Sequence, residues 1–356
     1  MTLRVFAQES ASFPALRLSL QCDTSRKHPK SLLMAKKILL VRTSSLGDII
    51  HTLPVAYDIK QAMPDAKLHW LAEDSFADVC TLSPFVDEVK KTAFRRWRKS
   101  LFSSKTWSEI GAVKANLRSE HYDTVIDAQG LLRSAWAASW SGSPVFGYSR
   151  DTVRESLATL FYKQTKGLPE SIGTVRRYRR MAALCLGYSI DEGHPKFGLR
   201  APKVPEDVTL PPDYATLFVS TSQERKNWQE ERWKVLIREL KALGLDSILF
   251  WGNEKEKERA LRIAGNEPFV HVLPRMPIPA VAAVVAHARI GIGVDTGLMH
   301  LAAALARPCV GIWVDTIPEN ISLIGEADCA TLGGKGADVT VKDVLVAVRQ
   351  RIPLHS

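Results

Sequence analysis

The sequence predicts an α/β protein of two Rossmann-like halves, each a doubly wound parallel sheet, which face each other across a cleft. Two observations favour this fold. Short apolar runs alternate with longer helical patterns, and a proline-rich stretch interrupts the alternation near the middle of the chain. The chain has 356 residues, which is long for a single compact core, and it is 46% apolar and 24% charged, as globular proteins are.

The segment 1–33 is rich in Ser, Arg and Lys and lacks the continuous apolar core of a signal peptide. Met34 stands just before the first clear strand, so we expect residues 1–33 to be a disordered extension or to follow from an upstream start codon. The expected halves are then 34–200 and 213–356. The linker between them is 201–212, where four prolines occur.

The first half begins with an apolar run over 38–41, which is typical of a strand buried on both faces. A Ser/Gly loop follows, and then a helical stretch over about 49–63, in which Pro54 marks a kink or the first turn. Further strands are expected at 68–71, 125–128 and 145–148, with helices between them.

The second half shows the alternation more clearly. Its expected strands are 217–219, 247–250, 270–273, 290–294 and, as the last one, 310–313. Its expected helices are 233–243, 254–264, 280–288 and 298–306. A final helix over 341–352 has an apolar face, and packing on its own sheet or back on the first half are both open.

Asp48 is the only carboxylate in the loop between the first strand and the first helix, which reads TSSLGDIIH from Thr43 to His51. Asp is a favoured helix N-cap, and that structural role is one interpretation. The other makes Asp48 a general base that takes a proton from an acceptor hydroxyl. A helix N-terminus lowers the pKa of a carboxylate and weakens it as a base, an objection that late proton transfer would remove.

Three loops that follow strands of the second half have residues suited to a nucleoside diphosphate. Thr296 and Gly297 open a helix whose free N–H groups favour anions, and His300 lies one turn further along. The loop 221–228 combines hydroxyls with cations, and the loop 251–256 offers carboxylates for ribose hydroxyls. Each has a structural alternative: a Thr cap, a solvated polar loop or a charged first helical turn.

The net charge of +10 indicates an acidic partner, which could be nucleic acid, anionic lipid or a phosphorylated substrate. Part of this charge lies in one cluster, for which a solvated loop is the alternative interpretation. The cluster surrounds Trp97 and consists of Lys90, Lys91, Arg95, Arg96, Arg98 and Lys99. Five scattered cysteines without a CxxC pair indicate neither a disulfide framework nor a zinc site, and they fit a reducing cytoplasm.

Several of these segments together resemble the ADP-heptose:lipopolysaccharide heptosyltransferase family. They occur in order along the chain from Met34: TSSLGD with IIHTLP, RRWRK, VIDAQGL, Arg154-Glu155 with LFY, the WG and NEKEKER segment, and VDTGLMHL. RRWRK and VIDAQGL resemble the enzymes that add the first heptose rather than the second. The family has the B-type glycosyltransferase fold, and the resemblance implies that 34–200 binds the acceptor and that 213–356 binds the donor.

The resemblance implies an inverting glycosyltransferase that moves heptose from ADP-L-glycero-D-manno-heptose to the Kdo residue of Kdo-lipid A. It implies that Asp48 is the catalytic base. The implied donor-binding residues are Thr221, Ser222, Lys226, Glu256, Met276, Asp295, Thr296, Gly297 and His300. The implied acceptor-binding residues are Arg95, Arg96, Arg98, Lys99, Gln129 and Arg154.

We expect no cofactor, no metal and no nucleic acid, and a monomer at the cytoplasmic face of the bacterial inner membrane, where the basic charge would hold it. The chain departs from the family pattern in the loop from Val314 to Pro318 and at Ser222, where Thr is common. Two alternatives remain open. One is a heptosyltransferase II that acts on a heptosylated acceptor, and the other is a non-catalytic basic protein that binds nucleic acid.

Overall fold

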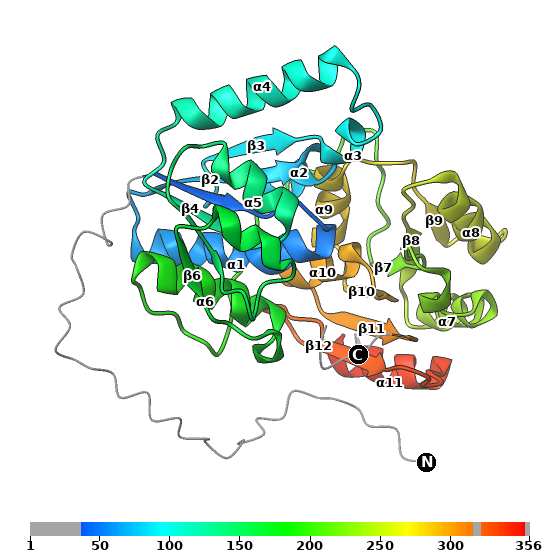
Figure 1. Cartoon of the computed structure of the whole chain (residues 1–356). Coiled ribbons are helices and arrows are strands. Elements are labelled where there is room, and N and C mark those ends of the chain that lie inside the picture. The colour runs from blue at the N-terminus through cyan, green and yellow to red at the C-terminus, as the bar shows by residue number, and fades with distance from the viewer. Residues whose placement is uncertain (1–36, 316–321, 353–356) are drawn as a thin grey trace.

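The computed structural model describes residues 37–315 and 322–352, and Figure 1 shows that they form two sheets with helices around each. Every strand pairing in the two sheets is parallel. This confirms the predicted fold class. The segment 1–33 and most of the divergent loop after Val314 lie outside the described residues.

The first sheet and its helices use residues 37–186. Its strands are β1 (Lys37–Val41), β2 (Lys67–Glu73), β3 (Glu88–Thr92), β4 (Thr124–Asp127), β5 (Val145–Tyr148) and β6 (Gln164–Lys166). Its α-helices are α1 (Leu46–Ala62), α2 (Asp74–Cys80), α3 (Phe94–Trp97), α4 (Ser104–Ser119), α5 (Leu132–Ser139) and α6 (Thr174–Leu186). Short 3₁₀ helices are η2 (Ser156–Phe161) and η3 (Glu170–Ile172).

The second sheet and its helices use residues 214–351. Its strands are β7 (Tyr214–Phe218), β8 (Asp246–Leu249), β9 (Val270–Val272), β10 (Ile290–Val294), β11 (Cys309–Trp313) and β12 (Cys329–Gly333). Its helices are η4 (Glu224–Lys226), α7 (Glu230–Ala242), α8 (Glu254–Ala264), α9 (Ile278–Ala286), α10 (Gly297–Ala304) and α11 (Val341–Arg351). Residues 201–212, between the sheets, contain neither helix nor strand.

The continuous apolar run of β1 follows from its position inside the sheet. Ile38 and Leu40 pack into the cluster that contains the apolar side chains of α1, while Leu39 and Val41 pack into a second cluster with α4 and α5. Both faces of the strand are therefore dry, as a parallel sheet between two helix layers requires.

The two sheets repeat one strand order. The first runs β3-β2-β1-β4-β5-β6 and the second β12-β11-β10-β7-β8-β9, so each sheet sets its first strand beside its fourth. The winding direction reverses between these two strands, and ligands of such sheets bind outside the carboxyl ends of the strands at that point. The loops after β1, β4, β7 and β10 are therefore the places where chemistry is expected.

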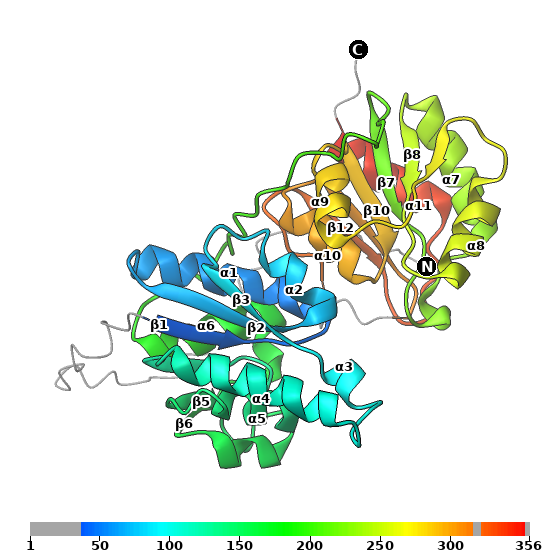
Figure 2. The same cartoon turned by 90° about the horizontal axis from the view of Figure 1, so that it is seen from above.

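The two halves meet directly through α1 and α10, which pack against each other (Figure 2). Apolar side chains of both helices belong to one buried cluster that crosses between the halves. Glycines allow the helix starts to approach: a Cβ on Gly297 would lie 2.8 Å from the Leu46 side chain, and one on Gly47 would lie 3.4 Å from the His300 ring. The first turns of the two helices are thus held side by side.

The structure corrects the predicted set of strands and decides two points that the sequence left open. The strands β3 and β6 were not anticipated, and Val310–Trp313 is not the last strand because β12 pairs beyond it. The helix α11 packs against β11, β12 and α7 of its own half rather than back on the first half. Pro54 lies inside α1 and not in its first turn. Among the described residues, no helix has the length and apolar character to cross a membrane.

Candidate functional site

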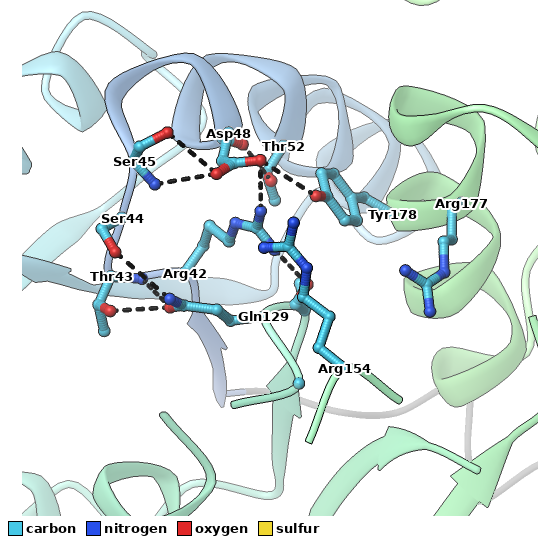
Figure 3. Close-up of polar contacts among 12 residues, drawn as sticks. Arg42, Thr43, Ser44, Ser45, Asp48, Thr52, Gln129, Arg154, Arg177 and Tyr178 are labelled. Atoms are coloured by element: carbon cyan, nitrogen blue, oxygen red, sulfur yellow. Dashed lines mark hydrogen bonds and ion pairs between the residues drawn. The ribbon is translucent and has the colours of Figure 1, made fainter. Parts of the chain in front are cut away.

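Asp48 occupies the third position of α1, at the carboxyl end of β1. Ser45, and not Asp48, is the N-cap; Asp48 completes a capping box by accepting hydrogen bonds from the backbone N–H and the hydroxyl of Ser45, both at 3.0 Å. Its other oxygen, Oδ1, lies 2.7 Å from the Arg42 guanidinium (Figure 3). The structural and the catalytic interpretations of Asp48 are thus compatible, because the cap uses one carboxylate oxygen.

The charge on Asp48 is set by opposing effects. Burial alone would raise the pKa of this carboxyl, but the Arg42 charge and the Ser45 hydrogen bonds outweigh burial and hold the pKa below its ordinary value. Arg154 adds to the lowering, and Figure 3 shows its side chain extending toward the same carboxylate. Asp48 is therefore ionised at neutral pH, and its side chain remains 27% exposed, so a substrate hydroxyl can reach it.

Arg42 is almost fully buried, and several contacts fix the position of its guanidinium. Its guanidinium donates to the Ala128 carbonyl at 2.8 Å and lies over the Tyr178 ring, 4.5 Å from the centroid. The Tyr178 hydroxyl in turn lies 3.5 Å from Asp48 Oδ1. Arg42 comes from the end of β1, Ala128 from the end of β4 and Tyr178 from α6, so three elements fix the carboxylate.

Gln129 ties together the two loops at the switch point of the first sheet. Its side-chain oxygen accepts from the backbone N–H of Thr43 at 2.8 Å and from the Thr43 hydroxyl at 2.7 Å. The Ser44 hydroxyl also accepts from Arg133 of α5 at 3.0 Å. These contacts assign Gln129 to the support of the Asp48 loop, while its contact with an acceptor stays a prediction.

At the switch point of the second sheet, an ion pair likewise connects the loops that follow β7 and β10. Lys226, at the end of η4, lies 2.6 Å from Asp295 Oδ2. Asp295 follows β10, and Thr296 is the N-cap of α10 without a side-chain hydrogen bond to the helix. An ammonium group and the free N–H groups of a helix start therefore converge on one loop, which is the arrangement that a diphosphate prefers.

A pair of buried histidines connects the two switch points. Nε2 of His51, on α1, lies 3.1 Å from Nδ1 of His300, on α10, and the other ring nitrogen of His300 lies 3.7 Å from Asp295. Burial and the neighbouring His300 lower the pKa of His51 to about 3, so His51 is neutral. One tautomer satisfies both contacts: His51 donates to His300, and His300 presents its own N–H toward Asp295.

The remaining predicted donor residues follow other strands of the second sheet. Thr221 and Ser222 lie in the loop after β7, half-buried and exposed respectively. The Glu256 carboxylate accepts from the backbone N–H of Gly252 at 2.7 Å, which makes it part of the cap of α8. Met276 is half-buried between β9 and α9. None of these placements tests a nucleotide contact, which stays a prediction.

The predicted acceptor cluster lies on and after α3, beyond the edge strand β3 and two strands away from β1. Arg95 lies over the Phe76 ring and Arg96 pairs with Glu109 at 2.6 Å, while Arg98 and Lys99 are exposed. This segment is a short helix and not a loop. The neighbouring Lys90 is not part of a solvated cluster, because it is buried in β3 and paired with two glutamates.

Sequence reasoning missed the partners of Asp48. Arg42 carried a signal, since a cation stood at the end of an apolar strand and six residues before the carboxylate. His51 stood within the quoted loop but without a role. Nothing in the sequence pointed to Tyr178, which lies 130 positions beyond Asp48.

One group in the described part of the chain gathers potential metal ligands: His69, Glu88 and Glu120. It lies toward the amino ends of β2 and β3, whereas Asp48 lies at the carboxyl end of β1. Lys90 pairs with both carboxylates and Lys37 pairs with Glu120, so positive charge already occupies the group. We interpret it as an ion-pair cluster.

Comparisons with known proteins agree with this geometry. A family model described as glycosyltransferase family 9 (heptosyltransferase) matches residues 110–343. Lipopolysaccharide heptosyltransferase 1 of Escherichia coli (strain K12) is 38% identical over 306 residues, which cover 86% of this chain and 92% of that protein. The Pseudomonas aeruginosa protein of the same name is 38% identical over 283 residues, 79% of each chain.

Solved structures show the same likeness. The structure of E. coli heptosyltransferase WaaC with ADP has a TM-score of 0.82 at 35% identity, covering 88% of this chain and 99% of that one. E. coli ADP-heptose lps heptosyltransferase II has a TM-score of 0.70 at 18% identity, a likeness of fold alone.

Replacing Arg42 with Met should raise the pKa of the Asp48 carboxyl by about one to three units, because the main opposing charge is lost. Arg42→Lys keeps a cation and should raise it less. Carboxyl ¹³C NMR titration would measure both. An unchanged Asp48 pKa in Arg42→Met would show that the ion pair does not control this carboxylate.

Replacing His51 with Leu should weaken ADP binding measured by calorimetry, because His300 loses the partner that fixes its tautomer, whereas His51→Gln should retain a donor and bind nearly normally. The pKa of His51 is about 3 in the folded chain and 6.5 in the unfolded chain. Between these pH values the unfolded chain binds a proton at His51 and the folded chain does not. The free energy of unfolding therefore decreases as the pH is lowered from 6.5 toward 3.

Both variants should show a shallower fall in stability between pH 6.5 and 3 than the parent chain, because neither can take up that proton. Urea unfolding at several pH values would measure it. Equal ADP affinity in the Leu and Gln variants would show that the His51–His300 contact does not contribute to donor binding.

Proposed function

This chain belongs to glycosyltransferase family 9, the heptosyltransferases, and from that premise we propose that it moves a heptose from ADP-L-glycero-D-manno-heptose to the Kdo residue of Kdo-lipid A. Family membership confirms the resemblance of the motifs and makes the protein a glycosyltransferase. The proposed donor is supported by the structure of E. coli WaaC with ADP-2-deoxy-2-fluoro heptose, a relative of 35% identity.

One observation carries the proposal: an ionised, part-exposed carboxylate lies at the switch point of the first sheet, in the first turn of α1, and α1 packs against α10. A carboxylate on one side and a diphosphate site on the other are what a single displacement at an anomeric carbon needs. Arg154 lines a hollow of about 470 Å³ with Asp151 and Glu170, where part of the acceptor would lie.

In the proposed step, Asp48 accepts the proton of a Kdo hydroxyl while the oxygen attacks the anomeric carbon of the heptose. The bond from that carbon to the diphosphate oxygen breaks, ADP leaves with the electron pair, and the configuration inverts. The low pKa of Asp48 makes it a weak base, so the proton moves late, when the new bond has acidified the hydroxyl.

Negative charge that gathers on ADP would be stabilised by Lys226 and by the N–H groups at the start of α10. The Lys226–Asp295 pair holds the ammonium close to that helix start. His300 donates from the same loop in the tautomer that His51 fixes. The roles of Thr221, Ser222, Glu256 and Met276 in binding the nucleoside and diphosphate belong to the same proposal.

The acceptor is anchored in a bilayer by its acyl chains, which supports a site of action at the cytoplasmic face of the bacterial inner membrane. The net charge of +10 would favour an anionic lipid surface.

The alternatives fare less well. The curated relatives at 36–38% identity bear the name heptosyltransferase 1, whereas the heptosyltransferase II structure is 18% identical. Membership of a glycosyltransferase family disfavours a non-catalytic nucleic-acid-binding protein. Incubation with ADP-heptose and either Kdo-lipid A or its heptosylated form, followed by mass spectrometry, tests the proposal; a heptosyl product on the heptosylated form alone would refute it.

Asp48→Asn should lower kcat on Kdo-lipid A by about 10²–10⁴-fold, because the amide cannot accept the proton while the shape of the site is kept. Asp78→Asn, on the exposed surface of α2, is the matched control and should be unchanged. ADP release and product mass give the rate. Near-normal turnover in a folded Asp48→Asn protein would exclude Asp48 as the base.

Lys226→Met should raise the KM for ADP-heptose by about tenfold or more and lower kcat as well, because a charge-assisted contact with the diphosphate is lost. Lys234→Met on α7 removes one charge away from the site and serves as the control. Steady-state kinetics with varied donor would measure the split. A donor KM that matches the control would contradict the assignment.

A further inference from the structure

Exposed large apolar side chains are concentrated on one part of the N-terminal half. Among the described residues, seven of the eleven that are most exposed fall between positions 101 and 160, and the other four are scattered. We call these seven the apolar rim: Leu101, Phe102, Trp107, Leu132, Trp136, Leu157 and Leu160. Phe102 is fully exposed and Leu160 is 78% exposed, so their burial by the fold itself is negligible.

Contacts connect elements that carry the apolar rim. Trp107 donates from its indole to the Leu101 carbonyl at 2.8 Å, which joins the start of α4 to the loop before it. Phe94 of α3 lies 6.4 Å from the Trp136 ring of α5, and α5 packs against η2. In Figure 2, α3 and the loop after it lie at the right end of the N-terminal half, and α5 lies below α4.

Cations accompany the apolar rim. Arg98, Lys99, Lys105 and Arg133 are exposed on the same elements, next to the rim residues in sequence. The carboxylates there are already engaged: Glu109 pairs with Arg96, and Glu155 accepts from the backbone N–H of Leu132. Apolar and aromatic side chains with basic neighbours are the composition of surfaces that enter the headgroup region of anionic bilayers.

The apolar rim also adjoins the catalytic loop. Leu132 and Trp136 are four residues apart and share a face of α5, and Arg133 of the same turn donates to Ser44, which is four residues before Asp48. A bilayer against this face would therefore lie beside the entrance through which an acyl-anchored acceptor must present its sugar.

We infer that the apolar rim is the surface with which this protein docks on an anionic lipid bilayer. The leucine and aromatic side chains enter the headgroup region, and the flanking Arg and Lys contact lipid phosphates. The inference rests on the proposed function, since it is the lipid-anchored acceptor that requires docking. The apolar contact acts in addition to the attraction between the basic protein and anionic lipid. Unlike that attraction, it is not screened by salt.

The test uses the full chain and vesicles of phosphatidylglycerol and phosphatidylethanolamine, with flotation at low salt and at about 0.5 M salt, where the Debye length is only a few ångströms. The double variant Phe102→Ser/Leu160→Ser should bind vesicles at least about tenfold more weakly at both salt concentrations. The control Leu261→Ser/Val346→Ser changes two exposed apolar side chains of the C-terminal half and should bind like the parent chain. Lys105→Glu should weaken binding at low salt only.

Turnover separates docking from catalysis. The rim variant should act normally on a water-soluble, deacylated Kdo saccharide and slowly on acceptor embedded in vesicles. The inference would be overturned if the rim variant bound vesicles as well as the parent chain does, or if the control variant lost as much binding. It would also be overturned if the parent chain were a dimer and the rim variant a monomer, with no change in vesicle binding. If the proposed function itself fails, no acceptor is heptosylated, yet the difference in vesicle binding persists.

Discussion

The packing of α1 against α10 is the contact on which the site depends. It brings the first turns of two helices from different sheets side by side, and glycines at positions 47 and 297 leave the room for this approach. Asp48 belongs to one first turn, and the N–H groups that we propose bind the diphosphate belong to the other. The separation of the proposed base from the proposed diphosphate site is therefore set by helix packing and the buried His51–His300 contact, not by the path of a flexible loop.

This arrangement is compatible with the proposal that a carboxylate of low pKa acts as the base. A helix start, Arg42 and Arg154 all favour the ionised form, so Asp48 is always ready to accept a proton but holds it weakly. A weak base that is fixed in place gains from proximity and orientation what it lacks in basicity. The contacts of Arg42 with Ala128 and Tyr178 hold its guanidinium beside Asp48, as the proposed mechanism requires.

The sequence predicted features that depend on local patterns. The run at β1, the strand–Asp-Thr-Gly–helix succession at β10 and the strand–loop–helix at Asp48 were identified because buried parallel strands and helix starts have strong local signatures. The strand β3 was missed because its sequence, EVKKT, is that of an edge strand with charged residues, and Lys90 was misplaced with it. The contacts of Tyr178, Gln129 and His300 join positions far apart in the chain, so no local pattern could reveal them.

The helix α5 relates the site to its surroundings. At its start, Arg133 reaches inward to the loop that holds Asp48, while Leu132 and Trp136 face outward from the same two turns. An element with one end at the catalytic loop and one face in the headgroup region would fix the height of the carboxylate above the bilayer. An acceptor anchored by acyl chains has its sugar at a limited height, so such a constraint would select substrates by distance from the membrane as well as by contact. The donor is soluble and needs no such limit, which fits a fold that leaves the second sheet away from this face (Figure 2).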